Sequence, residues 1–267
     1  MGADIKQLRT RIKSVDSTLH LTKAMGLVAS SKIRKATDSM NKGKEYAKAL
    51  EEMISQLTAY EECKNTPYMA QREGNNVCLV VIAGDRGLAG GYNANIFRLL
   101  REYPNAKVIP IGKRACERFG EAIVTAENYS YTNAMALAND ICHDFVAEKY
   151  DKFGIVCTKY HSLMSQEAYV KWLLPLTKGT QNNASNAIFE PDELTVLNAV
   201  IPEYIAGMII SCVKESFASE VAARRVAMDS AGKNAQEMID RLGLEYNRAR
   251  QGAITQEITE IVAGSGI

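Results

Sequence analysis

The first sixty residues carry the apolar repeat of a coiled coil. From Ile5 onward, apolar or small residues recur at alternating steps of three and four, and no proline interrupts them. A mean spacing of about 3.5 residues keeps one seam of a helix facing a partner helix along its whole length. We therefore predict a coiled-coil helix over residues 1–60. Its seam positions are Ile5, Leu8, Ile12, Val15, Leu19, Thr22, Gly26, Ala29, Ile33, Ala36, Met40, Gly43, Ala47, Leu50, Ile54 and Leu57.

The end of the chain provides the partner helix. From Pro202, which suits a first helical turn, the sequence favours helix to about Ala263, so residues 202–267 form the predicted second coiled-coil helix. Half of the residues from Ala218 to Ala235 are Ala, Ser or Gly, and Gly26 lies in a similar stretch of the first helix.

An antiparallel pair with these small residues facing each other would place residue 26 near residue 227, and Ile5 near Arg248. Residues 252–267 would then extend beyond the first helix as a single helix with Ile254, Ile258 and Ile261 on one face. An isolated helix cannot bury such a face by itself, so it needs a socket in another protein.

The middle of the chain has a different pattern of apolar and polar residues. Residues 61–76 are polar and form a predicted linker, and residues 77–201 alternate apolar strands with helical segments. The run Val77–Ala83 is continuously apolar, as in a parallel strand that is buried on both faces. We predict an α/β fold, in which a Rossmann-like domain with a mostly parallel sheet accompanies the long antiparallel coiled coil. Further strands are expected at Lys107–Ile111 and Phe153–Tyr160, with an edge strand at Tyr169–Leu176.

The first helix also carries a second apolar stripe and a basic charge. Leu21, Met25 and Val28 lie off the seam at helical spacing, which indicates either packing inside the chain or a surface for a partner. Residues 1–36 contain eight basic side chains and two acidic ones. Such a charge excess is typical of a solvated helix face, of a surface for an acidic partner, or of nucleic-acid binding.

The sequence shows no catalytic constellation and no cofactor motif. The turn Gly84–Gly91 follows a strand and precedes a helix, where a nucleotide phosphate could bind, but its glycine spacing matches neither a dinucleotide fingerprint nor a phosphate-binding P-loop. The six cysteines form no CxxC pair, and the three histidines have no metal-ligand spacing. We predict a protein that is not an enzyme by itself and that needs no cofactor or metal.

Neither a signal peptide nor a spanning segment is expected. The N-terminus is charged and amphipathic, and the longest apolar runs, Val77–Ala83 and Ile205–Val213, are too short to cross a bilayer.

Three separate stretches together resemble one family. LTKAMGLVASSKIRK (Leu21–Lys35), AGDRGLAGGYN (Ala83–Asn93) and YNRARQGAITQEITEIVAG (Tyr246–Gly264) are similar, in the same order, to motifs of the gamma subunit of rotary F-type ATP synthases. The resemblance covers essentially the whole chain and implies the fold predicted above. It implies a central rotor shaft, peripheral at the cytoplasmic face of the cell membrane. Its implied partners are the alpha and beta subunits of the catalytic hexamer, the epsilon subunit and the c-ring of the membrane sector.

The resemblance also implies roles for individual residues. Lys23 and Met25, with Arg224 opposite, match positions that face an acidic loop of beta, and Ile254, Ile258 and Ile261 would form the tip inside an apolar bearing. Asp85, Arg86 and Gly87 fall in the middle motif, near the c-ring or epsilon end. Ala89 stands where many members carry Cys or Ser, and the chloroplast redox insert is missing. The positions matched to alpha and beta contacts are Lys23, Met25, Arg224, Arg250, Gln251, Thr255, Glu257 and Glu260.

Two other functions fit parts of the sequence. A coiled-coil adaptor, or a basic rod that binds nucleic acid, would use the charged first helix and would need no apolar tail. A Rossmann-type enzyme would bind a nucleotide at Gly84–Gly91.

Overall fold

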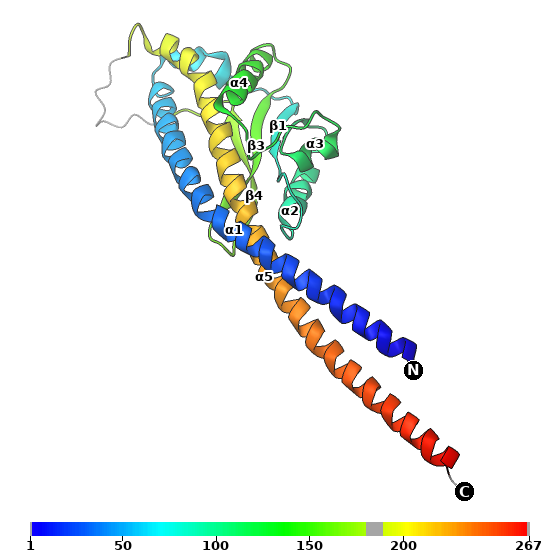
Figure 1. Cartoon of the computed structure of the whole chain (residues 1–267). Helices are drawn as coiled ribbons and strands as arrows, with labels where there is room; N and C mark the ends of the chain where they lie inside the picture. The colour runs from blue at the N-terminus through cyan, green and yellow to red at the C-terminus, as the bar shows by residue number, and fades with distance from the viewer. Residues whose placement is uncertain (1, 180–188, 266–267) are drawn as a thin grey trace. The chain divides into compact units, whose positions relative to one another are not determined.

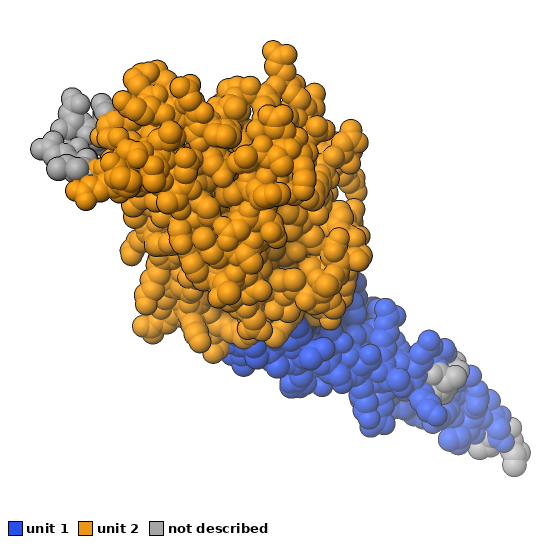
Figure 2. All heavy atoms as spheres, turned by 90° about the horizontal axis from the view of Figure 1, so that it is seen from above, with its two compact units in different colours: residues 1–30, 224–267 blue, residues 31–223 orange. Residues whose placement is uncertain are grey.

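The computed structural model describes residues 2–179 and 189–265 in two compact units, coloured separately in Figure 2. One unit consists of residues 1–30 and 224–267, and the other of residues 31–223. Two long helices, α1 (Gly2–Leu57) and α5 (Glu193–Ser265), contribute to both units. Met1, residues 180–188 of the predicted α/β domain and residues 266–267 of the predicted C-terminal helix lie outside the described part of the chain.

A four-stranded sheet forms the centre of the larger unit, in the order β2-β1-β3-β4. Its strands are β1 (Val77–Ile82), β2 (Lys107–Ile111), β3 (Lys152–Tyr160) and β4 (Gln166–Leu174). The first three strands are parallel, and β4 joins β3 antiparallel at the edge. The α/β prediction is confirmed, and the expected edge strand starts three residues earlier than predicted.

Helices cover both faces of the sheet (Figure 1). The short helices α2 (Tyr92–Leu99) and α3 (Lys113–Phe119) lie on one face, and α4 (Tyr131–Val146) lies on the other with α1 and α5. Alternate residues of β1 point into the two cores: Val80 lies in the core with α4, α1 and α5, and Leu79 in the core with α2 and α3. Burial on both faces explains why β1 is apolar at every position.

The segment predicted as a linker packs on this unit. It contains two short 3-10 helices, Glu62–Asn65 and Pro67–Met69, and Cys63 is fully buried. Arg72 donates hydrogen bonds to the carbonyl oxygens of Phe145 and Tyr150, at 2.8 and 3.0 Å. Residues 61–76 are therefore held on the α/β layer by specific contacts.

Helix α5 begins at Glu193, before the predicted start at Pro202, and Pro202 lies inside the helix. An interior proline costs about 3 kcal/mol because it lacks a backbone donor. Leu197, Ile201 and Ile205 are fully buried around it, and each buried side chain contributes about 1.5–3 kcal/mol. Packing therefore outweighs the local cost of the proline.

A side-chain cap marks the true start of α5. Asp192 accepts hydrogen bonds from the backbone amide and the hydroxyl of Thr195, both at 2.8 Å. The hydrogen bond from the backbone amide of Thr195 is the main cause of the lowered pKa of Asp192. This aspartate is a typical helix N-cap, ten residues before the predicted start at Pro202.

The coiled-coil seam is confirmed in the larger unit. From Ile33 to Leu57, every predicted seam position of α1 is buried or half-buried. A Cβ atom added at Gly43 would lie 3.6 Å from the Cα atom of Ser211, and one added at Gly207 would lie 2.4 Å from Leu50 Cδ1. Position numbers fall on α5 as they rise on α1, so the two helices are antiparallel.

A buried carboxylate links these helices to the sheet. Glu215 of α5, whose side chain is 8 % exposed, lies 2.7 Å from Lys44 Nζ on α1. It also accepts a hydrogen bond from the backbone amide of Tyr160, at the end of β3. This single side chain therefore connects α1, α5 and the sheet.

We expect Glu215→Leu to destabilise the larger unit by about 2–3 kcal/mol, because it leaves the Lys44 charge and a backbone donor without their acceptor. The measurement is urea unfolding followed by the fluorescence of Trp172, the chain's single tryptophan, on β4. Glu52→Leu is the matched control, since the Lys48–Glu52 pair is exposed and should change stability by less than about 0.5 kcal/mol. Equal effects of the two changes would contradict this assignment.

The smaller unit is an antiparallel helix pair. A Cβ atom added at Gly26 would lie 3.7 Å from Met228 Cβ, so residue 26 faces a position one residue beyond the predicted 227. Gly232 lies opposite Thr22 in the same register. Continued along both helices, this register places Ile5 opposite Ala249, one residue from the predicted Arg248. The seam positions from Ile5 to Ala29 are all buried or half-buried, as predicted.

By length and composition, α5 is the one helix among the described residues that could cross a membrane. Its most apolar part includes Ile201, Ile205 and Ile209, which are fully buried in the core of the larger unit. Burial in a protein core accounts for this composition without a membrane.

Candidate partner-binding surfaces

The end of α5 carries an apolar face on which none of the described residues packs. The half-buried positions of α5 in the smaller unit continue to Ala253, and residues 254–264 are all exposed. Figure 1 shows this end of α5, in red, continuing past the start of α1 in dark blue. Ile254, Ile258 and Ile261 are 46 %, 56 % and 68 % exposed. Three exposed isoleucines on one helix face are typical of a surface that another protein covers.

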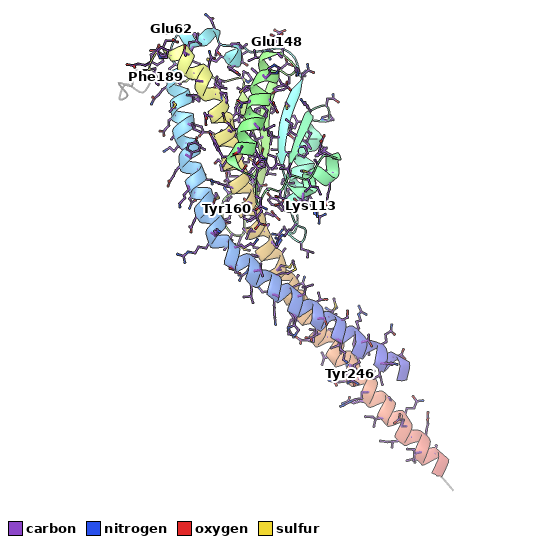
Figure 3. All side chains as sticks on the ribbon, turned by 45° about the horizontal axis from the view of Figure 1, so that its top comes forward. Glu62, Lys113, Glu148, Tyr160, Phe189 and Tyr246 are labelled. Atoms are coloured by element: carbon purple, nitrogen blue, oxygen red, sulfur yellow. The ribbon has the colours of Figure 1, made fainter. Side chains whose placement is uncertain are left out.

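Polar positions predicted for partner contacts surround this face. Arg250, Gln251, Thr255, Glu257 and Glu260 are all exposed. Tyr246, labelled in Figure 3, lies one turn before Arg250 and is half-buried. The tail therefore presents an apolar face flanked by polar side chains, as an amphipathic helix does before it binds.

A groove runs between the helices of the smaller unit, where the sequence is rich in small residues. It has a volume of about 460 Å³, with Gly26 and Gly232 in its wall. Lys23, Arg225 and Lys233 line it with a single acidic residue, Asp229, which pairs with Lys233 at 2.9 Å. The groove is positively charged and suits an acidic partner surface.

The second stripe of α1 is mostly exposed. Leu21 and Val28 are 58 % and 54 % exposed, and Met25 is half-buried beside them. Lys23 is also exposed. Arg224 differs, because it is only 9 % exposed, and the half-buried Arg225 is the arginine that lines the groove with Lys23. Of the residues predicted to face beta, Arg224 is the least accessible.

Polar groups of the turn Gly84–Gly91 form hydrogen bonds with other parts of the chain. The carboxylate of Asp85 accepts hydrogen bonds from the backbone amides of Lys113, Ala126 and Glu127, at 2.8–3.0 Å. Asp85 thereby fixes the segment that leads into α4. Arg86 keeps an exposed side chain that lies 3.5 Å from Glu127, and Gly87 lies beside Arg114.

A buried carboxylate occupies the place where a phosphate would bind. Glu220 of α5 is 1 % exposed, and its Oε1 accepts a hydrogen bond from the Arg86 amide at 3.4 Å. A Cβ atom added at Gly84 would lie 2.8 Å from the Glu220 carboxyl carbon. The Gly84 amide donates to Asn93. The amides of Gly84 and Arg86 thus donate to side chains of the chain itself, and the Glu220 carboxyl group occupies space that a phosphate would need.

Two exposed apolar residues were not predicted from the sequence. Leu27 is 72 % exposed and lines the groove beside the second stripe. Leu88 is 61 % exposed and has a φ of +61°, an uncommon backbone conformation for leucine. The spacing of Leu27 from the seam could have revealed it, whereas the φ of Leu88 depends on the tertiary structure.

The cysteines and acidic residues form no cluster for a metal ion in the part of the chain that the structure describes. All six cysteines are free and buried. Burial raises the pKa of Cys78 and of Cys142 to about 11, so both thiols stay protonated at neutral pH. Within residues 2–179 and 189–265, no group of three or more His, Cys, Asp or Glu side chains could hold a metal ion.

The fold and its surfaces define a class of protein. Two long antiparallel helices from the two chain ends, an α/β domain encoded between them and an exposed apolar tail are the features of a subunit with helical surfaces for other proteins.

Comparison with known proteins shows the family to which the chain belongs. The family model described as ATP synthase matches residues 4–266. The ATP synthase gamma chain of Geotalea uraniireducens is 34 % identical, with 98 % of each chain covered. The sodium-ion-specific ATP synthase gamma chain of Acetobacterium woodii is 35 % identical, with 99 % of each covered. The chain belongs to the family of ATP synthase gamma chains.

A solved structure shares the fold. A chain in the OSCP/F1/c-ring assembly of the Euglena gracilis mitochondrial ATP synthase superposes with a TM-score of 0.68, at 19 % identity. The match covers 100 % of this chain and 97 % of the Euglena chain. The long helix pair with an α/β insertion is therefore shared at low sequence identity.

Proposed function

We propose that this chain is the central rotor shaft of an F-type ATP synthase, a subunit that is not catalytic by itself. It would couple cation-driven rotation of the c-ring to ATP synthesis and hydrolysis in the alpha/beta hexamer. The observation that carries this proposal is the exposed tail, because Ile254, Ile258 and Ile261 need a protein socket. Membership of the gamma chain family supports it.

The surfaces divide between the proposed partners. The tail and the basic groove would face the alpha and beta subunits, with Lys23 and Met25 toward an acidic loop of beta. Exposed ion pairs contribute little one by one, but a basic surface attracts an acidic partner collectively. The larger unit would hold the epsilon subunit and stand on the c-ring, at the cytoplasmic face of the membrane. The side of this unit around Arg86 and Gly87 would face that end.

The buried carboxylate at the turn disfavours the alternative of a nucleotide-binding enzyme. Glu220 already accepts the Arg86 amide and Asn93 accepts the Gly84 amide, two donors of the turn that a phosphate would need. A nucleic-acid-binding rod would leave the apolar tail without a use. The shaft uses both the tail and the basic groove.

The test is co-expression with the alpha and beta subunits of the same organism, using the full chain and a chain that ends at Arg250. We expect the full chain to co-elute with the hexamer and to stimulate its ATPase activity. Truncation should weaken binding by about tenfold or more, because it removes the apolar contacts of the tail. The melting temperature of the isolated chain should change little, since the described residues beyond Ala253 are exposed. A full chain that stays separate and leaves ATPase unchanged would refute the shaft.

A further inference from the structure

The larger unit contains a cavity that none of the proposed contacts uses. It has a volume of about 500 Å³, within the range of small-molecule sites. Three segments form it: residues 32–39 of α1, the stretch 126–129 before α4, and residues 210–217 of α5. Ala36, Val213 and Ile210 contribute apolar surface and are 4 %, 3 % and 8 % exposed, and the half-buried Phe217 adds an aromatic ring.

The wall that closes the cavity is fixed by hydrogen bonds and ion pairs. Asp85 holds the backbone amides of Ala126 and Glu127, at 2.9 and 2.8 Å. The Glu127 side chain in turn lies 2.5 Å from Lys32 Nζ, which connects this wall to α1. The cavity therefore has a defined shape, which favours binding because little ordering is required.

The charge of the cavity is positive and only partly balanced. Lys32, Lys35 and Lys214 line it, with Glu127 as the acidic residue. Lys32 pairs with Glu127, whereas neither Lys35 nor Lys214 has an acidic partner within 4 Å among the described residues. Burial raises the pKa of Tyr129 to about 12, so its hydroxyl adds no negative charge and stays able to donate.

We propose that this cavity binds a small amphipathic anion. Its apolar body, of aromatic or short acyl character, packs on Ala36, Val213 and Phe217. Its sulfonate, carboxylate or phosphate head pairs with Lys35 and Lys214. Desolvation of the body provides most of the affinity, and the two lysines select for the negative charge.

The probe for the test is 8-anilinonaphthalene-1-sulfonate, which combines a two-ring apolar body with one negative head. It is titrated into the full chain by calorimetry and fluorescence. Methyl NMR of Ala36, Ile210 and Val213 locates it, with Leu21 of the second stripe and Leu27 of the groove as reporters for binding to the smaller unit. We expect saturable binding with shifts confined to the cavity methyls.

Variants of the two lysines test the charge. Lys35→Glu with Lys214→Glu should weaken binding about tenfold or more, since attraction becomes repulsion. Lys35→Arg with Lys214→Arg should bind like the parent. Lys42→Glu with Lys152→Glu, at exposed positions outside the cavity, is the matched control and should stay within about twofold. The neutral analogue N-phenyl-1-naphthylamine should bind more weakly, and its affinity should be the same for the parent chain and for the chain with Lys35→Glu and Lys214→Glu.

Three outcomes would overturn the proposal. They are no saturable binding at millimolar probe, shifts at Leu21 and Leu27 in place of the cavity methyls, or equal losses in the reversed and control pairs. Circular dichroism of every variant ensures that a lost signal reflects the site and not a loss of folding. None of these outcomes depends on assembly with other subunits, so the shaft and the cavity are tested separately.

Discussion

Replacing Gly112 by alanine should destabilise the larger unit by about 3–5 kcal/mol. Gly112 has a φ of +95° and a ψ of 140°, a backbone conformation that is largely restricted to glycine. A Cβ atom there would lie 1.9 Å from the backbone oxygen of Ala83, and a backbone atom cannot rotate away as a side chain can. Strain and overlap together place the change among the largest effects of single substitutions.

The overlap also threatens the neighbouring backbone bonds. The Ala83 amide donates to the Ile111 carbonyl oxygen at 2.9 Å, and the Arg114 amide donates to the Gly84 oxygen at 3.1 Å. Moving Ala83 away would loosen the ends of β1 and β2. Urea unfolding followed by the fluorescence of Trp172 measures the loss, since Trp172 lies on β4 of the same sheet.

Gly120 is the matched control. It has a φ of +70°, and nothing lies within 4 Å of an added Cβ atom. Gly120→Ala should therefore cost only the backbone strain, about 1 kcal/mol. A loss at Gly112 no larger than the loss at Gly120 would show that Ala83 yields easily, and would contradict this account.

Charging the apolar face of the tail should abolish most of its binding to the alpha/beta hexamer. Ile254→Asp with Ile258→Asp places two carboxylates where we propose an apolar socket. Each buried charge without a partner costs several kcal/mol, so we expect at least a hundredfold loss of affinity and a matching loss of ATPase stimulation. Both isoleucines are about half exposed in the free chain, so its urea midpoint should hardly move.

The control adds the same charge to the opposite side of the same helix. Gln256→Asp with Thr259→Asp changes two exposed polar residues and leaves the isoleucine face intact. Co-elution and ATPase stimulation should then stay within a few-fold of the parent. If both pairs of changes reduce binding equally, net charge and not the apolar face would explain the effect.

The sequence alone was sufficient for the coiled coil, because a repeat is a local property. The spacing from Ile5 to Leu57 determines which side of α1 is covered, and the small residues near Gly26 and Met228 determine the register to within one residue. Likewise, the continuous apolar run Val77–Ala83 predicted a strand buried on both faces. The tail face followed from helical spacing once the register was known.

Other features depended on contacts between residues far apart in the chain. Helix α5 passes through Pro202 because Leu197 and Ile201 are buried, and no local pattern shows that burial. Glu220 accepts a hydrogen bond from the backbone amide of Arg86 in the turn, although the two residues lie 134 positions apart in the sequence. Arg224 was expected on a partner surface and is buried, while Arg225 lines the groove.

The sequence by itself thus determined the two long helices, the sheet encoded between them in the chain, the apolar tail and the family. Only the tertiary structure decided which polar groups are used internally and where space remains. Asp85 became an anchor for the segment 126–127, and that segment completes a cavity with Lys35 and Lys214. The physical reason is that periodicity reports burial along one element, whereas hydrogen bonds and cavities arise where several elements meet.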